Sequence, residues 1–141
     1  MKRAAGILGY NDVVITNLCS VATPSIVEVN GLGHDAWMSA RADLELAIRT
    51  ARGVLAAWGV GGLNGDARRW QHAQIEWLAN RAGTEDLHSF WMVGGEPRHP
   101  SRWHQYISDK YGRTRGGSFE ERLAQVLVDV PTRDLSRPAR G

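Results

Sequence analysis

The chain has a single cysteine among its 141 residues, Cys19, which excludes an internal disulfide and suits a reducing compartment. It has no apolar run of 18 residues, so no segment is predicted to span a membrane. The apolar stretch behind its charged start is too short for a signal peptide. One thiol cannot build a structural zinc site, and we find no other metal or cofactor motif. The sequence therefore predicts a cytoplasmic protein without a cofactor.

The length and composition predict one folded domain. Hydrophobic residues make up 43% of the chain, and its 6 tryptophans supply large apolar areas for burial. A chain of this length can build one core but not two. We therefore predict a single α/β domain over residues 1–131, followed by a flexible tail over 132–141 that mixes Arg, Pro and Gly.

Three short apolar runs have the pattern of strands that are buried on both faces. They cover residues 13–18, 54–58 and 89–93. Stretches with apolar residues at helical spacing lie between and after them. Because strands that alternate with helices form parallel βαβ units, we predict a three-layer α/β domain with a mainly parallel central sheet.

The predicted helices carry recognisable signals. The first covers residues 37–51, with Asp35 as its expected N-cap. The second is expected to bury an apolar face made of Trp70, Ala73, Trp77 and Leu78. The last opens on the capping box Ser118-Phe119-Glu120-Glu121 and is expected to end at Pro131.

A stiff loop, Gly95-Glu96-Pro97-Arg98-His99-Pro100-Ser101, follows the third apolar run. Each proline fixes its own φ and biases the preceding residue toward extended geometry, so the segment cannot lie inside a helix. A cation, an imidazole and a hydroxyl just past a strand end are typical of a functional site in an open α/β protein. The alternative is a surface turn whose Arg98 and His99 only add solubility.

Positive charge is concentrated around this loop. Residues 96–117 hold five Lys and Arg against two acidic residues, a formal net charge of +3, whereas the whole chain has +2. Aromatic side chains are interleaved with these cations. Arginines together with aromatic rings can hold a phosphate backbone and stack on bases. The alternative is an ordinary solvated loop whose aromatic rings pack inward.

The predicted parallel sheet places the candidate site residues along one edge, because residues just past the carboxyl ends of parallel strands lie together. These residues follow the three runs in turn: Asn17 with Thr23, Gly59 with Gly61, and Arg98 with His99. For Asn17 the alternative is a local role, in which its side chain bonds the backbone at a strand end.

Short motifs follow one another along the first hundred residues: Val14-Ile15-Thr16-Asn17-Leu18, Ala22-Thr23-Pro24, Gly31 with Asp35, Ala57-Trp58-Gly59, and Gly95-Glu96-Pro97-Arg98-His99-Pro100. In this order, from about Arg3 to Pro100, they resemble the bacterial and phage family called the domain of unknown function numbered 1643. Members of that family usually begin with a further strand and an Asn-Pro-Ser loop. This chain starts after that point and also departs from the family beyond Pro100.

That family is in turn similar to the uracil-DNA glycosylases, so the resemblance implies a glycosylase-like fold truncated at its N-terminus. It implies that Asn17 reads a base edge and that His99 stabilises charge developing on the base. It also implies that Ser101 and Arg102 contact phosphate. The glycosylase loop that carries the water-activating group is missing here, so catalysis is expected to be weak or absent.

We therefore predict a protein that binds DNA, RNA or a nucleotide, and leave open whether it is an enzyme. One alternative is a small, phage-encoded module that binds a host protein, and another is an enzyme acting on free nucleotides or nucleosides. A basic, aromatic surface favours nucleic acid, a pocket over Asn17 favours a nucleotide, and a large apolar patch favours a protein partner. The missing first strand would expose a sheet edge, which predicts a homo-oligomer unless the N-terminal segment or the last helix covers it.

Overall fold

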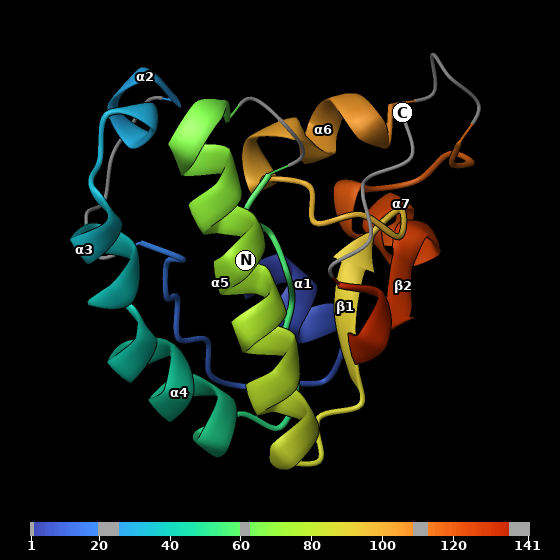
Figure 1. The fold of residues 1–141 in the computed structure, drawn as a ribbon. Helices are drawn as coiled ribbons and strands as arrows, with labels where there is room; N and C mark the ends of the chain where they lie inside the picture. The colour runs from blue at the N-terminus through green and yellow to red at the C-terminus, as the bar shows by residue number, and fades with distance from the viewer. Residues whose placement is uncertain (1, 20–25, 60–62, 109–112, 136–141) are drawn as a thin grey trace. The chain divides into compact units, whose positions relative to one another are not determined.

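Helices dominate the structure of this chain. The computed structural model describes residues 2–19, 26–59, 63–108 and 113–135 (Figure 1). Of the chain, 52% is helical. It divides into two compact units, each assembled from separate stretches: unit 1 is Met1–Ile15, Leu55–Val60 and Trp91–Val130, and unit 2 is Thr16–Val54, Gly61–Phe90 and Pro131–Gly141.

The sheet formed by the described residues has two antiparallel strands, β1 (Ser89–Val93) and β2 (Leu127–Pro131). Two backbone bonds of 2.7 Å fix its register at the two ends, one from Gly94 N–H to the Val126 carbonyl and one from Thr132 N–H to the His88 carbonyl. The run predicted as a strand at 89–93 is therefore confirmed as β1.

The mainly parallel central sheet of a three-layer α/β domain is wrong for this chain. Residues 13–18 form no strand, and Val14 and Ile15 are 82% and 65% exposed. Residues 54–58 contribute one parallel bridge, from Leu55 to Trp91 on β1. An apolar run shows that a segment can form a strand, but it becomes one only where a neighbouring strand pairs with it. The glycosylase-like α/β fold is thereby corrected to a mostly helical fold with a small antiparallel sheet.

The outer edge of β2 is poorly suited to further pairing. Because Val126 and Thr132 bond to β1, the alternation of an antiparallel ladder turns the backbone groups of Asp129 and Pro131 outward. Pro131 has no N–H to offer, and Asp129 places a charge on that edge. Both are devices by which edge strands discourage pairing. A homo-oligomer through a sheet edge stays a prediction.

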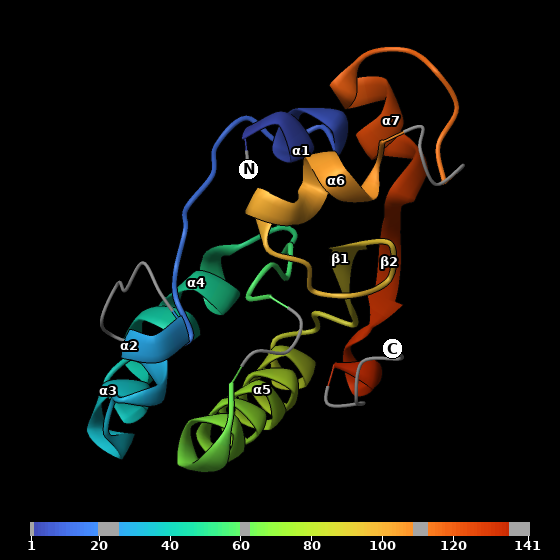
Figure 2. The ribbon, with the colours of Figure 1, turned by 90° about the horizontal axis from the view of Figure 1, so that it is seen from above.

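Unit 1 packs short helices around the Val93 end of β1. Its helices are α1 (Lys2–Ile7), the 3-10 turn η1 (Pro100–Arg102), α6 (Trp103–Tyr106) and α7 (Phe119–Val126). Figure 2 shows α1 beside α7, and the two helices are in contact. The core of this unit is the buried set Ala4, Val93, Trp103, Ile107, Leu123 and Val126.

Unit 2 is built on the longest helix, α5 (Gly65–Thr84), which contacts each of its neighbours. These are α2 (Ile26–Asn30), α3 (His34–Met38), α4 (Arg41–Thr50) and the 3-10 turn η3 (Thr132–Asp134). Figure 1 shows α3 and α4 along one side of α5. The buried apolar residues of this unit include Trp37, Leu44, Ile48, Ile75, Leu78 and Ala82.

A buried amide organises the core of unit 2. Gln74 on α5 is 1% exposed, and its Nε2 donates to the carbonyl oxygens of Leu18 (2.8 Å) and Trp37 (2.7 Å). Its Oε1 accepts from Arg41 Nε at 2.9 Å. Because a buried polar group without partners is costly, this set of bonds ties the segment at Leu18, α3 and α4 to one position on α5.

Two predicted helices differ from the observed ones. The stretch 37–51 is divided between α3 and α4, and the N-cap of α3 is Gly33 instead of Asp35. The helix that opens on Ser118 ends at Val126, five residues before Pro131, because the chain turns into β2 and pairs with β1. Its capping box is confirmed, since Ser118 Oγ accepts the backbone N–H of Glu121 at 3.2 Å.

Part of the stretch where we expected a flexible tail is ordered. Thr132 donates its hydroxyl to the Leu87 carbonyl at 2.6 Å, and Leu135 is 6% exposed at the end of η3. Residues 136–141 lie outside the described part of the chain.

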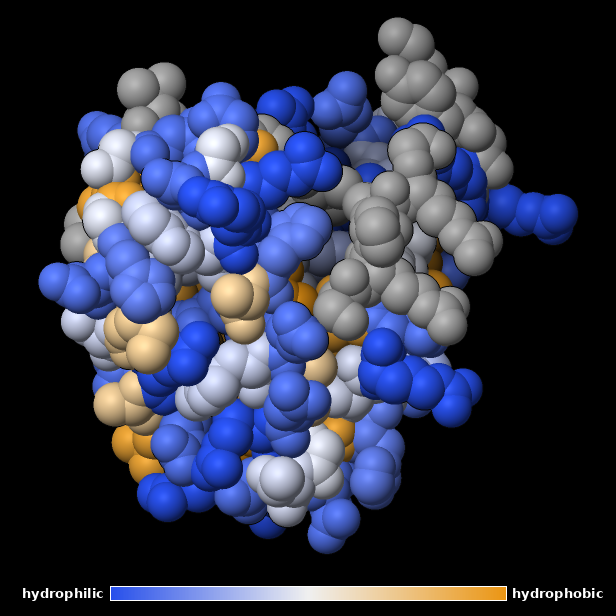
Figure 3. Space-filling model, in the orientation of Figure 1, coloured by the Kyte–Doolittle hydropathy of each residue, from blue (hydrophilic) through white to orange (hydrophobic). Residues whose placement is uncertain are grey.

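Hydrophilic side chains cover most of the face drawn in Figure 3, with apolar residues in small separate spots. Among the described residues, the exposed large hydrophobic side chains are Val14, Ile15, Met38, Leu46 and Val128. Among the residues that the structure describes, no helix combines the length and apolar character needed to cross a membrane.

Candidate nucleic-acid interface

The loop between the two prolines is fixed in unit 1 by its own side chains. His99 caps η1: its Nδ1 accepts the backbone N–H of Ser101 at 3.2 Å and lies 2.8 Å from the Ser101 hydroxyl oxygen. Trp103, which is 3% exposed, donates its indole N–H to the Arg98 carbonyl at 3.1 Å. A buried ring therefore anchors the loop to the core and leaves His99 exposed.

Because Nδ1 of His99 is an acceptor, the proton of the neutral ring lies on Nε2. An Nε2–H group at the surface is a hydrogen-bond donor. It can donate a hydrogen bond to an anionic oxygen of a ligand, but it cannot accept a proton from a ligand.

Arg98 is held within the protein and is only partly available to a ligand. Its side chain is 25% exposed, and its Nη2 lies 3.2 Å from a carboxylate oxygen of Glu96. Its guanidinium lies over the ring of Tyr106, 4.1 Å from the centroid. The ion pair and the stacking both lower the tendency of Arg98 to bind phosphate, and both support the loop.

Tyr106 lies at the centre of the basic region. Its hydroxyl end packs against Gly94, where an added Cβ would overlap the ring. Gly94 also has φ of +67°, a conformation that L side chains rarely adopt. Arg113 lies over the same ring, 4.6 Å from the centroid, and donates to the Tyr106 carbonyl at 3.3 Å.

The segment 113–115 presents two arginines on either side of a buried threonine. Thr114 is 5% exposed and donates its hydroxyl to the Ile107 carbonyl at 2.6 Å. Gln125 on α7 holds the backbone of Arg115 with two bonds of 3.0 Å, one donated and one accepted. Arg113 and Arg115 are consequently both exposed, because they flank the one side chain that points inward.

We call Arg98, Arg102, Arg113 and Arg115 the arginine cluster. Arg102 precedes Tyr106 by four residues in the continuous helical run of η1 and α6, so the two lie on the same side of that run. Within the described part of the chain, neither Arg102 nor Arg115 forms an ion pair. The cluster therefore combines two arginines that stack on Tyr106, Arg98 and Arg113, with two further exposed arginines, Arg102 and Arg115.

A second pair of rings lies next to the cluster in unit 1. His104 on α6 stacks on Phe119 at 4.3 Å between centroids, and the guanidinium of Arg3 lies 5.0 Å from the same Phe119 centroid. Arg3 is also paired with Glu120 at 3.2 Å. This contact adds an exposed imidazole to the surface but no unpaired arginine.

The structure brings together some of the predicted site residues. Gly59 donates its N–H to the Pro97 carbonyl at 2.7 Å, and a Cβ on Gly59 would lie 3.8 Å from the Cβ of His99. The predicted neighbourhood of Gly59 and His99 is therefore observed within unit 1. Asn17 belongs to unit 2, where it is exposed and follows no strand, and its role stays a prediction. Thr23 and Gly61 lie outside the described residues.

The sequence interpretation missed Tyr106, Thr114 and Gln125. Tyr106 entered the sequence interpretation only as one of several aromatic residues interleaved with the cations. For Thr114 a signal existed, since a small hydroxyl residue between two arginines fits a segment whose alternate side chains point inward and outward. Nothing in the sequence pairs Gln125 with Arg115, because that contact depends on the return of α7.

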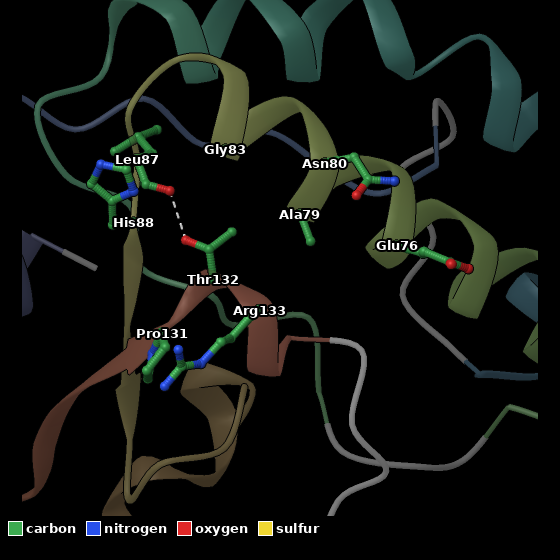
Figure 4. Close-up of a pocket in the computed structure, with 9 residues that line it drawn as sticks. All are labelled: Glu76, Ala79, Asn80, Gly83, Leu87, His88, Pro131, Thr132 and Arg133. Carbon is green, nitrogen blue, oxygen red and sulfur yellow. Dashed lines mark hydrogen bonds between the residues drawn. The ribbon is translucent and has the colours of Figure 1, made fainter.

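A groove with a volume of about 590 Å³ lies in unit 2, away from the arginine cluster residues in sequence (Figure 4). It runs between the second half of α5 and the residues around Leu87 and Thr132. Asn17 does not line it. No group of three or more His, Cys, Asp or Glu that could hold a metal ion occurs among the described residues.

Comparison with protein-family models, with curated proteins and with solved structures finds no match to this chain. The resemblance to the domain of unknown function numbered 1643 therefore stays a prediction.

Proposed function

We propose that this protein binds nucleic acid through the arginine cluster of unit 1. The observation that carries the proposal is the anchoring of Thr114, which keeps Arg113 and Arg115 exposed, with Arg113 stacked on Tyr106. Phosphate groups along a nucleic acid backbone are bound by guanidinium groups at the surface, with release of counterions. Fixed arginines lose less conformational freedom on binding than mobile ones.

The other predicted contacts fit the same surface. Ser101 and Arg102 are exposed on η1, next to His99, whose Nε2–H can donate to a phosphate oxygen. Arg98 pairs with Glu96 and stacks on Tyr106, so we assign it a positioning role more than a direct contact. Reading of a base edge by Asn17 remains part of the proposal without support from geometry.

Catalysis is proposed to be weak or absent. His99 uses Nδ1 as an acceptor within the loop, which leaves a donor on the exposed side of the ring. No carboxylate pairs with this ring in the part of the chain that the structure describes. A histidine in this state can stabilise negative charge but is not set up as a general base.

Equilibrium binding tests the proposal directly. Labelled single-stranded DNA, RNA of the same sequence and the corresponding DNA duplex are titrated with the protein at low salt. Arg102→Ala should weaken binding to all three, because a phosphate contact carries no sequence information. The matched control is Arg49→Ala, which removes an exposed arginine of α4 in the other unit and should leave the affinity unchanged. If the wild-type protein binds none of the three ligands, the proposal fails.

One observation favours the alternative of a protein-interaction module. Val14 and Ile15 are adjacent, β-branched and mostly exposed in an extended segment, and burying each would contribute roughly 1.5–3 kcal/mol. A partner protein could supply that burial. If Val14→Ser with Ile15→Ser leaves nucleic-acid binding intact but abolishes a protein complex found in the source cell, both activities belong to the chain.

A further inference from the structure

Residues 11–17 form an open segment after α1 that pairs with no strand in the described part of the chain. The segment contains four consecutive β-branched residues, Val13-Val14-Ile15-Thr16, a composition that favours strands. No backbone N–H or carbonyl of residues 11–17 bonds to the backbone of another described residue. Figure 2 shows the chain leaving α1 along an extended course. The segment therefore has the composition of a strand, and its backbone donors and acceptors are left to water.

Both faces of this segment are exposed as well. Successive side chains of an extended chain point to opposite sides. Val14 is 82% exposed and Ile15 is 65% exposed, so an apolar side chain faces solvent on each side. Bare β-branched residues on an unpaired backbone are a template for pairing with another chain. The chemistry that covers such a segment is a second strand, because only an extended backbone can bond to its donors and acceptors along their whole length.

The two ends of the segment are held by the folded protein. Tyr10 donates its backbone N–H to the Ala5 carbonyl at 2.8 Å, and the Leu18 carbonyl accepts from the buried Gln74 at 2.8 Å. A segment held at both ends loses less conformational freedom on pairing than a free peptide does. This advantage offsets part of the low stability of a two-stranded ribbon in water.

The order of the side chains around Val14 indicates that the partner strand is the same segment of a second copy. In an antiparallel pair with a two-fold axis at Val14, each residue faces the one that lies equally far on the other side of Val14. The facing pairs are Val14 with Val14, Val13 with Ile15, Asp12 with Thr16, and Asn11 with Asn17. Aliphatic side chains thus meet aliphatic ones, and polar side chains meet polar ones. The segment is complementary to itself in this register.

Charge favours the antiparallel over the parallel arrangement. Asp12 is the only charged residue in the segment. In a parallel, in-register pair it would face Asp12 of the other copy, and like charges directly opposite each other are destabilising. In the antiparallel pair each carboxylate faces the hydroxyl of Thr16, which can donate a hydrogen bond to it.

We propose that two copies of this protein associate through residues 11–17, which pair as antiparallel strands about a two-fold axis at Val14. The pairing buries Val13, Val14 and Ile15 against their counterparts and satisfies the backbone groups between the strands. This interface does not use the outer edge of β2, where Asp129 and Pro131 discourage pairing. It is also separate from the arginine cluster, so it does not rest on nucleic-acid binding.

The molar mass in solution tests the association. Light scattering of the full chain, at concentrations up to about 1 mM so that weak association is detected, should show a rise from the mass of one chain to that of two. Val14→Asp and Val14→Lys should each stay at the mass of one chain, because like charges then face each other at the axis. An equimolar mixture of the two variants should regain the mass of two chains. The matched controls are Leu46→Asp and Leu46→Lys, at another exposed apolar residue, which should associate like the unaltered protein. Circular dichroism checks that each variant is folded.

Disulfide trapping tests the register. In a Cys19→Ala background, oxidation should link two Val14→Cys chains, because facing Cα atoms of an antiparallel pair lie about 4.5–5.5 Å apart, within the reach of a disulfide. Asp12→Cys should not link to itself, since its two copies lie about 14 Å apart in this register, but it should link to Thr16→Cys when the two are mixed.

Three results would overturn the proposal. The first is the mass of one chain at every concentration, and the second is association that survives Val14→Asp, which would place the interface elsewhere. The third is linkage of Asp12→Cys to itself in preference to Thr16→Cys, which would show a parallel pair.

Discussion

Thr114 donates its hydroxyl proton to the carbonyl oxygen of Ile107 over 2.6 Å, and both residues are buried in unit 1. This bond determines where the segment after α6 returns to the core. Arg113 and Arg115 are exposed because Thr114 between them points inward. A neutral, buried hydrogen bond thus sets the position of two charges at the surface.

Thr114→Val should destabilise the protein and also weaken nucleic-acid binding. Valine has the same shape but leaves the Ile107 carbonyl without its donor, at a cost of about 1–3 kcal/mol in the free energy of unfolding. Urea unfolding measures this loss. Thr114→Ser keeps the hydroxyl and should retain most of the stability and the affinity. Equal effects of the two substitutions would show that the bond does not matter.

Gly94→Ala should be more harmful than its size suggests. The new methyl group would overlap the ring of Tyr106, and φ of +67° is unfavourable for alanine. We expect a loss of about 1–3 kcal/mol in the free energy of unfolding, together with displacement of Tyr106. Thermal unfolding measures the loss of stability, and the NMR signals of the Tyr106 ring report its displacement. The control is Gly6→Ala in α1, where a Cβ meets nothing within 4 Å and stability should be unchanged or higher.

Gln74→Leu should strongly destabilise unit 2. Leucine fits the size of the site but leaves the carbonyl oxygens of Leu18 and Trp37 without a donor. The expected loss is about 2–5 kcal/mol in the free energy of unfolding, since two buried acceptors are affected. Gln71→Leu alters a half-exposed glutamine on the same helix and serves as the control. The rate of amide hydrogen exchange in α3 and α5 should rise in Gln74→Leu and not in Gln71→Leu. Similar protection of these helices in both variants would contradict the role assigned to Gln74.

Local signals predicted parts of the fold well. The capping box at Ser118 and the strand at 89–93 were found because the first depends on residues three apart and the second on a continuous apolar run. Residues 13–18 have the same kind of run, but no neighbouring strand pairs with them in the structure. The sequence could not distinguish these two runs, because strand formation depends on contacts with distant residues.

The buried face of α5 shows why an apolar pattern can mislead. The expected face contained Trp70 and Trp77, but these rings are half-buried and pack beside His34 and Arg41. The observed face is Ala67, Gln74, Ile75, Leu78 and Ala82. The spacing of hydrophobic residues cannot indicate that Gln74 is buried. Its burial depends on hydrogen bonds to the carbonyl groups of Leu18 and Trp37, which are distant in sequence.

The candidate site was predictable only in part. The prolines around Arg98 and His99 correctly indicated a fixed loop, and Gly59 lies beside His99 as expected. The stacking of Arg98 on Tyr106 was not predictable. Nothing in the sequence distinguishes an arginine that packs on an aromatic ring from one whose side chain is free in solvent. The sequence thus located the basic region but not the division between supporting and exposed arginines.

The salt dependence of binding to single-stranded DNA tests the central claim most directly. The account predicts that log K falls linearly with log salt, and that Arg102→Ala combined with Arg115→Ala lowers the slope by about 1.4, the value for two lost phosphate contacts. The control pair, Arg49→Ala with Arg68→Ala, removes two exposed arginines of unit 2 and should leave the slope unchanged. A wild-type affinity that does not depend on salt, or an equal reduction of the slope in both double variants, would contradict binding through the arginine cluster.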